Sequence, residues 1–131
     1  MNVYKIKTSL TQEGLDELQK SMDESDFILI NSVEDKVLNV DIIEDGFVSS
    51  YMICSEKILD LLKSIFYKYE VIFSVQDITK LFLYGQVDVD DVDFQNYLED
   101  NLDIDIILDK INEVGIDSLS DLDKDILSGN M

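Results

Sequence analysis

The stretch SEKILDLLKSIFYKYEVIFSV, residues 55–75, contains a helical pattern followed directly by a strand pattern. Its apolar residues recur at three- and four-residue steps, the spacing of one face of an α-helix. Ser55 is a good N-cap, and Glu56 suits the positive end of the helix dipole. A run rich in β-branched residues, 71–75, then predicts a strand. We therefore expect a helix over 55–69 that packs on a sheet, with this apolar face: Ile58, Leu61, Leu62, Ile65, Phe66 and Tyr69.

The composition is that of a globular protein in a reducing compartment. The chain has 131 residues, of which 46% are apolar, enough to bury a core within one domain. The single cysteine, Cys54, cannot form an internal disulfide, and we expect it to be a small buried hydrophobe. A signal segment and an apolar run near 18 residues are both missing from the sequence. These features predict a soluble, cytoplasmic protein.

Several residue types are missing, and each absence excludes a class of chemistry. The chain has no His, Arg, Trp or Pro. Without imidazole there is no Ser-His-Asp or Cys-His nucleophile system, and zinc sites built on His or on several Cys are excluded. Without Arg there is no bidentate clamp on phosphate. We therefore do not expect an enzyme, and the sequence indicates no cofactor.

The N-terminal part of the chain alternates strand and helix patterns. Asp45-Gly46 is the strongest hairpin signal, because Gly accepts the positive φ that such turns require. Ser9 and Thr11 compete as the cap of the first helix. The expected elements are a strand at 3–8, a helix at 9–22, strands at 27–33, 37–43 and 47–53, and then the 55–69 helix and 71–75 strand.

This order predicts an α+β fold. We expect an antiparallel sheet of four or five strands (β-α-β-β-β-α-β) with helices on one face. An acidic helical section follows, with helices at 78–84, 93–102, 104–114 and from Ser118 or Ser120 to Leu127; a strand through 81–84 is the alternative to the first of them. We expect one domain, residues 1–131, with the sheet layer in 1–76 and the helical section in 77–131.

The charge is strongly negative, and it is concentrated in the second half. The net charge is −19, from 29 acidic residues against ten basic ones, all of them lysine. Such a chain repels nucleic acid and anionic membranes and favours a basic partner or cations. Between Lys80 and Lys110 there is no basic residue but a run of acids: Asp88, Asp90, Asp91, Asp93, Glu99, Asp100, Asp103, Asp105 and Asp109.

Two interpretations of this run remain open. It is either a solvated face that includes acids at helix N-termini, or a partner-binding face in which aromatic side chains are buried among carboxylates. For the second, we expect Tyr97, with Tyr84, to be the anchor. The predicted partner-binding residues are Asp88, Asp90, Asp91, Asp93, Tyr97, Glu99, Asp100, Asp103 and Asp105.

Two metal-dependent alternatives are weaker. Asp88, Asp90 and Glu99 match positions 1, 3 and 12 of an EF-hand loop, but Asp93 stands where that loop needs Gly. Glu34-Asp35-Lys36, after Asp26, has the residue types of a magnesium-dependent nuclease. It falls on an expected hairpin turn, however, where acids and lysine are common. We predict no metal site.

The sequence therefore favours a non-enzymatic acidic protein that binds a basic protein partner, a toxin or a nucleic-acid-binding protein. It would be an immunity or antitoxin-like protein, or a nucleic-acid-mimicking inhibitor of bacterial or phage origin. The alternative is a structural or adaptor subunit that docks through an apolar helix face. The two differ in salt dependence, because charge-driven binding weakens with salt and apolar docking does not.

Overall fold

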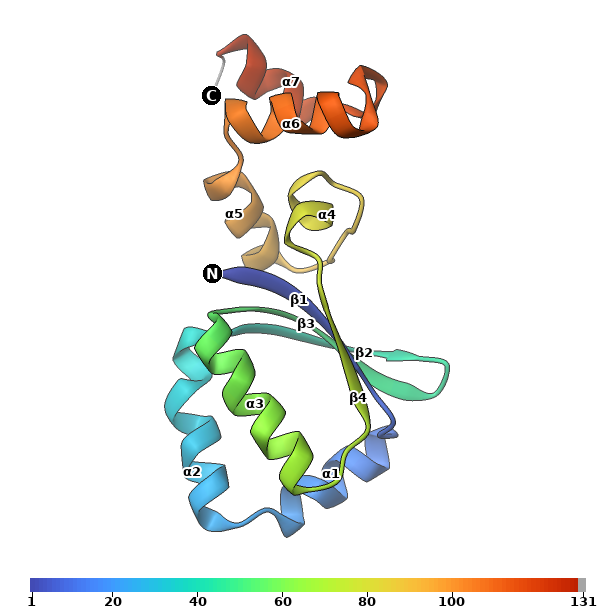
Figure 1. The fold of residues 1–131 in the computed structure, drawn as a ribbon, viewed down its shortest axis with the longest axis vertical. Coiled ribbons are helices and arrows are strands. Elements are labelled where there is room, and N and C mark those ends of the chain that lie inside the picture. Colours follow the sequence, from blue (N-terminus) through green and yellow to red (C-terminus); the bar gives the residue numbers. More distant parts are fainter. Residues whose placement is uncertain (130–131) are drawn as a thin grey trace. The chain divides into compact units, whose positions relative to one another are not determined.

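A computed structural model describes residues 1–129 and divides the chain into two compact units (Figure 1). We call Met1–Ile78 the sheet unit and the part from Thr79 onward the helical unit. The expected change of layer at residue 76 falls close to this division. The described residues include no helix that is both long and apolar enough to span a membrane.

The sheet unit confirms the expected α+β class with an antiparallel sheet. The sheet has four strands in the order β2-β3-β1-β4, and every neighbouring pair is antiparallel. Asp45 and Gly46 join β2 to β3 with positive φ angles of 54° and 87°, as a tight hairpin requires. The strands are β1 (Asn2–Thr8), β2 (Leu38–Glu44), β3 (Phe47–Cys54) and β4 (Phe73–Asp77).

Three helices lie over the same face of this sheet (Figure 1). The Thr11 hydroxyl caps the first, accepting from the backbone N–H of Gly14 at 3.0 Å, so that Thr11 rather than Ser9 is the N-cap. Ser55 caps the third as expected, accepting from Ile58 N–H at 3.3 Å. The helices are α1 (Gln12–Ser21), α2 (Glu24–Val33) and α3 (Glu56–Lys68), with a short 3₁₀ turn, η1 (Glu34–Lys36), after α2.

The strand predicted at 27–33 is wrong, because this segment is part of α2. A short, nearly continuous apolar run fits a buried strand and a helix equally well by periodicity alone. Here Glu24 and Asp26 lie in the first helical turn, where acidic side chains are favoured by the helix dipole. The element order before the helical unit is therefore β-α-α-β-β-α-β instead of the expected β-α-β-β-β-α-β, and the sheet has four strands, within the expected four or five.

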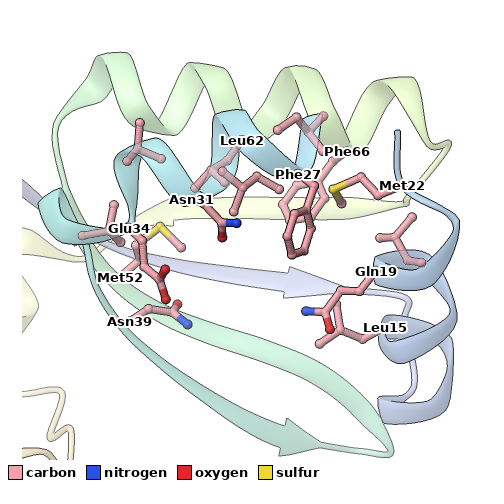
Figure 2. A pocket seen from close by; sticks show the side chains of 15 residues that line it. Leu15, Gln19, Met22, Phe27, Asn31, Glu34, Asn39, Met52, Leu62 and Phe66 are labelled. Carbon is pink, nitrogen blue, oxygen red and sulfur yellow. The ribbon is translucent and has the colours of Figure 1, made fainter. Parts of the chain in front are cut away.

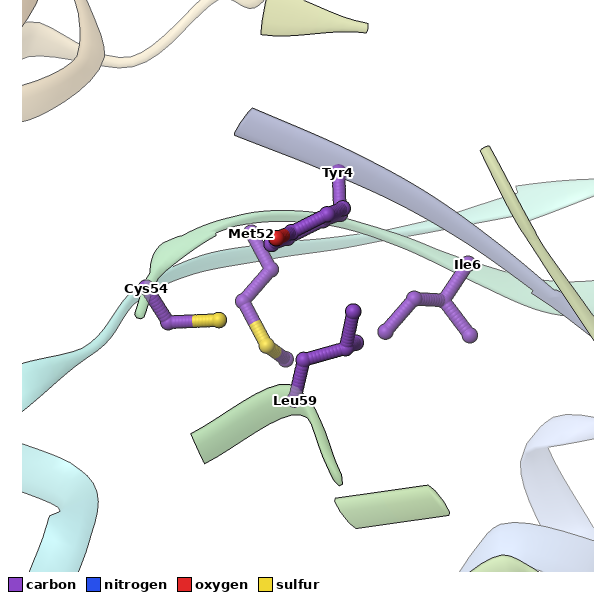
Figure 3. Close-up of a cluster of buried hydrophobic side chains, with 5 residues drawn as sticks. All are labelled: Tyr4, Ile6, Met52, Cys54 and Leu59. Carbon is purple, nitrogen blue, oxygen red and sulfur yellow. The ribbon is translucent and has the colours of Figure 1, made fainter. Parts of the chain in front are cut away.

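The core of the sheet unit lies between the central strands and α3 (Figure 3). Tyr4 of β1 pairs in register with Met52 of β3, and both side chains meet Leu59 of α3. Cys54 is fully buried here, and burial raises the pKa of its thiol. The expectation that Cys54 is a buried hydrophobe is thus confirmed.

The helical unit confirms the expected helices and excludes the strand alternative at 81–84. Phe82 and Phe94 meet edge to face, with ring centroids 6.0 Å apart, and both are almost fully buried. Ser120 begins the last helix with a capping box completed by Asp123. The elements are α4 (Thr79–Leu83), α5 (Val92–Asn101), α6 (Ile104–Val114), η2 (Ile116–Ser118) and α7 (Asp121–Ser128).

Candidate functional site

The predicted partner-binding residues all belong to the helical unit. They occupy the loop before α5, α5 itself, and the junction of α5 with α6. Seven of the eight acids are exposed to solvent, and Asp91 is half-buried. We call residues 88–105 the acidic segment.

Part of the acidic segment is explained by helix formation. The Asp91 carboxylate accepts from the backbone N–H groups of Asp93 and Phe94 at 3.1 and 3.2 Å, which caps α5. Asp103 caps α6 in the same way, accepting from Ile106 N–H at 2.9 Å. These bonds satisfy backbone donors that a helix leaves unpaired at its start. The solvated-face interpretation therefore accounts for some of these acids.

Other members of the segment have no such role. Asp90 precedes the cap of α5, and Glu99 and Asp100 lie in its last turns, where the helix dipole disfavours negative charge. Their carboxylates accept no hydrogen bond and form no ion pair within residues 1–129. Folding of the described chain gives no reason for these charges.

Tyr97 lies among the acids of α5. Asp93, Tyr97 and Asp100 follow each other at four- and three-residue steps and so share one face of the helix. Tyr97 is half-buried, and burial raises the pKa of its hydroxyl. The phenol ring thus has a carboxylate one turn before it and another one turn after it.

Tyr84, the second expected anchor, is not available to a partner. Only 5% of its surface is exposed, and burial raises the pKa of its hydroxyl. The expectation fails because alternation of aromatic and acidic residues in the sequence does not reveal which aromatic residue points inward. Tyr84 belongs to the core of the helical unit.

The lysines of the helical unit do not neutralise the acidic segment. Lys80 pairs with Glu113 at 2.8 Å, and Lys110 is buried against Asp123 at 2.7 Å. None of the eight acids lies within ion-pair distance of a lysine of residues 1–129. The acidic segment therefore projects an uncompensated negative field.

The metal-dependent alternatives gain no geometric support. In the described part of the chain, no three acidic or cysteine side chains come together as a metal-binding group. Asp88, Asp90 and Glu99 do not gather as an EF-hand loop would require; Asp88 accepts instead from the Gln95 amide at 3.3 Å. Glu34–Lys36 form a 3₁₀ turn after α2 and not the expected hairpin turn.

A second feature, not foreseen from the sequence, is a pocket in the sheet unit (Figure 2). It has a volume of about 430 Å³ and lies between α1, α2, α3 and the sheet. Eleven of its fifteen lining side chains are apolar. The signal in the sequence was the spacing of Phe27, Ile30, Asn31 and Glu34, which places them on one helical face.

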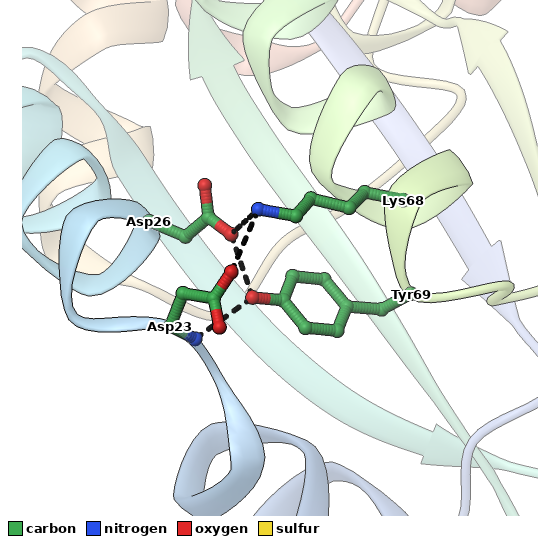
Figure 4. Close-up of polar contacts among 4 residues, drawn as sticks. All are labelled: Asp23, Asp26, Lys68 and Tyr69. Carbon is green, nitrogen blue, oxygen red and sulfur yellow. Dashed lines mark hydrogen bonds and ion pairs between the residues drawn. The ribbon is translucent and has the colours of Figure 1, made fainter.

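A polar cluster ties the start of α2 to the end of α3 (Figure 4). The Lys68 ammonium group donates to Asp23 at 2.9 Å and to Asp26 at 2.7 Å. The Tyr69 hydroxyl donates to the same Asp26 oxygen at 2.6 Å and accepts from the backbone N–H of Asp23 at 2.8 Å. The start of α2 is thus fixed to the end of α3.

This cluster predicts that the attachment of α2 weakens in acid. The hydrogen bonds from Lys68 and Tyr69 hold the pKa of Asp26 below its usual value of 3.8. Because the folded-state pKa is lowered, the contribution is complete above pH 3.8 and is lost as the pH falls through the lower folded-state value. We expect Asp26→Asn to lower the midpoint temperature of thermal unfolding near neutral pH. Below the folded-state pKa of Asp26, the midpoints of the variant and the wild type should become equal. A pH series of thermal unfolding measures this, and parallel curves down to the lowest pH would refute it.

Comparison of the chain with protein-family models, with curated proteins and with solved structures finds no match.

Proposed function

We propose that this protein is a non-enzymatic, cytoplasmic binding protein that presents the acidic segment to a basic site on a partner protein. The observation that carries the proposal is the set of eight carboxylates in the acidic segment, none of which pairs with a lysine of residues 1–129. Like charges kept together destabilise the free protein. A basic partner relieves that repulsion on binding, which gives a reason for keeping the charges together.

The charges would act mainly on the rate of encounter. A negative field attracts a basic surface at distances of about 10 Å or less at 0.1 M salt. Carboxylates would then occupy the positions that nucleic-acid phosphates take on the partner. This suits an immunity or antitoxin-like protein bound to a toxin, or a nucleic-acid-mimicking inhibitor.

Apolar side chains near the acids would hold the complex together once it has formed. Tyr97 supplies an aromatic surface between two carboxylates, and Ile104, 51% exposed, lies between Asp103 and Asp105. Large apolar or aromatic residues ringed by polar groups are typical of the residues that dominate binding energy. The expected partner surface is basic at its edge and apolar at its centre.

A second candidate rests on α6. Ile104 and Leu108 are one turn apart on this helix, and both are about half exposed. Such a pair could dock an apolar surface, with the charge serving only solubility. The protein would then be a structural or adaptor subunit.

The salt dependence of partner capture separates the two candidates. The full chain is immobilised, incubated with lysate of its source cell, and washed at about 50 mM and then at about 500 mM salt. We expect a single basic protein that is retained at low salt and released at high salt, since charge-driven affinity falls steeply over this range. A partner that survives the high-salt wash would favour the adaptor, and the absence of any salt-sensitive basic partner would contradict the proposal.

A further inference from the structure

Because of the pocket in the sheet unit, the apolar side chains of α1 and α2 are not fully buried. Neither α1 nor α2 has a buried residue, although both turn apolar side chains toward the sheet. Of the eleven apolar side chains around the pocket, only Met52 and Ile65 are buried. Apolar surface left in water is unfavourable in proportion to its area. A molecule filling the pocket would cover this surface.

The size and shape of the pocket fit a small molecule. Its volume of about 430 Å³ lies within the range of roughly 300–1,000 Å³ that is usual for ligand sites. The walls come from α1, α2 and α3 and from the strands β2 and β3, so the space is enclosed from several directions. Mostly apolar walls with a few convergent polar groups are the usual composition of such sites.

Three of the four polar side chains of the pocket gather toward one end, and the fourth, Gln19, lies toward the other. Figure 2 shows Asn31, Glu34 and Asn39 on the side of Met52, with Leu15, Gln19 and Met22 toward the other side. The side chains of Asn31 and Glu34 form no hydrogen bond and no ion pair within residues 1–129. They are therefore available to a ligand.

The charge at this end of the pocket determines which polar head group of a ligand can bind there. Glu34 accepts hydrogen bonds only, and Asp35 and Asp41 add negative charge nearby in the sequence, against a single lysine, Lys36. A carboxylate or phosphate head would be repelled here. An ammonium head would be attracted to Glu34 and could donate to the amide oxygens of Asn31 and Asn39.

We propose that this pocket binds a small cationic amphiphile, with the apolar part between α1, α2 and α3 and the amine at Asn31, Glu34 and Asn39. The site belongs to the sheet unit and is independent of the acidic segment. A failure of one proposal therefore leaves the other standing.

Two methionines report on the site directly. Met52 lies toward the polar end of the pocket and Met22 toward the opposite end, whereas Met1 does not line it (Figure 2). The full chain, labelled with ¹³C at the methionine methyl groups, is titrated separately with decylamine, decanol and decanoate below their micelle concentrations. We expect saturable changes in the NMR chemical shifts of the Met22 and Met52 methyl groups and no change for Met1. The affinity should be highest for decylamine and lowest for decanoate.

Variants separate the head-group contact from general attraction to an acidic protein. Glu34→Gln should lower the affinity for decylamine about two- to fivefold, the range for one exposed charge pair, and leave the affinity for decanol unchanged. Glu24→Gln removes the same charge from α2 at a position that does not line the pocket, and should change neither affinity. Ile30→Trp should fill the pocket and remove binding of all three probes. Because Glu34 is exposed, its variant remains informative even if Ile30→Trp unfolds the chain.

Four results would overturn the proposal. The first is the absence of shifts at Met22 and Met52 with every probe. The second is decanoate binding as tightly as decylamine. The third is an equal loss of decylamine affinity in Glu34→Gln and Glu24→Gln, and the fourth is unchanged binding in a folded Ile30→Trp variant.

Discussion

Replacing Lys110 by methionine is expected to destabilise the helical unit by about 3–5 kcal/mol, the usual cost of removing one partner from a buried ion pair. The Lys110 ammonium group lies 2.7 Å from the Asp123 carboxylate, and the two residues are 3% and 1% exposed. Without the lysine, a carboxylate would stay buried with Ser120 as its remaining hydrogen-bond partner among residues 1–129. Urea unfolding followed by far-UV circular dichroism, with hydrogen exchange of α6 and α7, measures the loss.

The same variant should become less destabilised as the pH falls. In the wild type, burial alone would raise the pKa of Asp123, but the hydrogen bonds from Lys110 and Ser120 outweigh it and hold this pKa below 3.8. In the Lys110→Met variant we expect burial to outweigh the remaining hydrogen bonds from Ser120, so that the folded-state pKa of Asp123 rises above the unfolded one. Folding then takes up a proton, so the deficit is largest well above the raised pKa and shrinks below it.

Lys124→Met is the matched control. It makes the same chemical change on α7, at an exposed lysine with no ion pair within residues 1–129, and should alter the free energy of unfolding by no more than about 0.5 kcal/mol. The double variant Lys110→Met/Asp123→Leu should recover much of the loss, because apolar pairs often replace buried ion pairs at little cost. Equal stabilities of Lys110→Met and Lys124→Met would contradict the buried pair.

Replacing Asp90, Asp91 and Asp93 by asparagine is expected to slow association with the basic partner about tenfold or more at low salt, since electrostatic steering raises on-rates by 10 to 10³. The dissociation rate should change much less, and the difference from the wild type should shrink as salt rises. Stopped-flow association with the salt-eluted partner, at several ionic strengths, measures both rates.

Folding should survive these three substitutions. Asp91 caps α5, and asparagine is as good an N-cap as aspartate. Asp93 loses a favourable interaction with the helix dipole, but the repulsion among the neighbouring acids is relieved at the same time. We expect the free energy of unfolding to remain the same or to rise slightly.

Glu13→Gln, Asp16→Asn and Glu17→Gln together form the control. These residues lie on α1 in the sheet unit and are exposed. Their substitution changes the net charge by the same three units. We expect a clearly smaller slowing of association. Equal slowing would assign the effect to net charge alone, and unchanged association in both variants would leave the acidic segment as a solubility device.

The sequence predicts elements well where local signals agree with one another. In α3 the three- and four-residue spacing, the Ser55 cap and the strand pattern after it all indicate the structure that forms. Asp45-Gly46 specifies its hairpin because few other residue pairs accept two positive φ angles. The missing histidine and arginine exclude whole mechanisms without any structure.

Local signals fail where the outcome depends on distant segments. The run at 27–33 fits a strand and a helix equally well, and it forms most of α2 in a fold where the end of α3 holds the start of this helix through Lys68 and Tyr69. Lys110 lies on the apolar stripe of α6, three residues after buried Ile107, which could have indicated a buried lysine but not its partner. Tyr84 and Tyr97 look alike in sequence, yet one is buried and the other half-buried.

The sequence by itself determined the fold class, the chemistries that are excluded, and the charge that any partner must complement. Composition and local periodicity are sufficient for these, because composition and net charge are sums over the chain and periodicity depends only on neighbouring residues. Only the tertiary structure decided that Lys110 meets Asp123, that no lysine of residues 1–129 pairs with the acidic segment, and that a pocket lies beneath α1 and α2. Each of these depends on which side chains from distant parts of the chain come within a few ångströms of one another, and spacing along the sequence does not encode that distance.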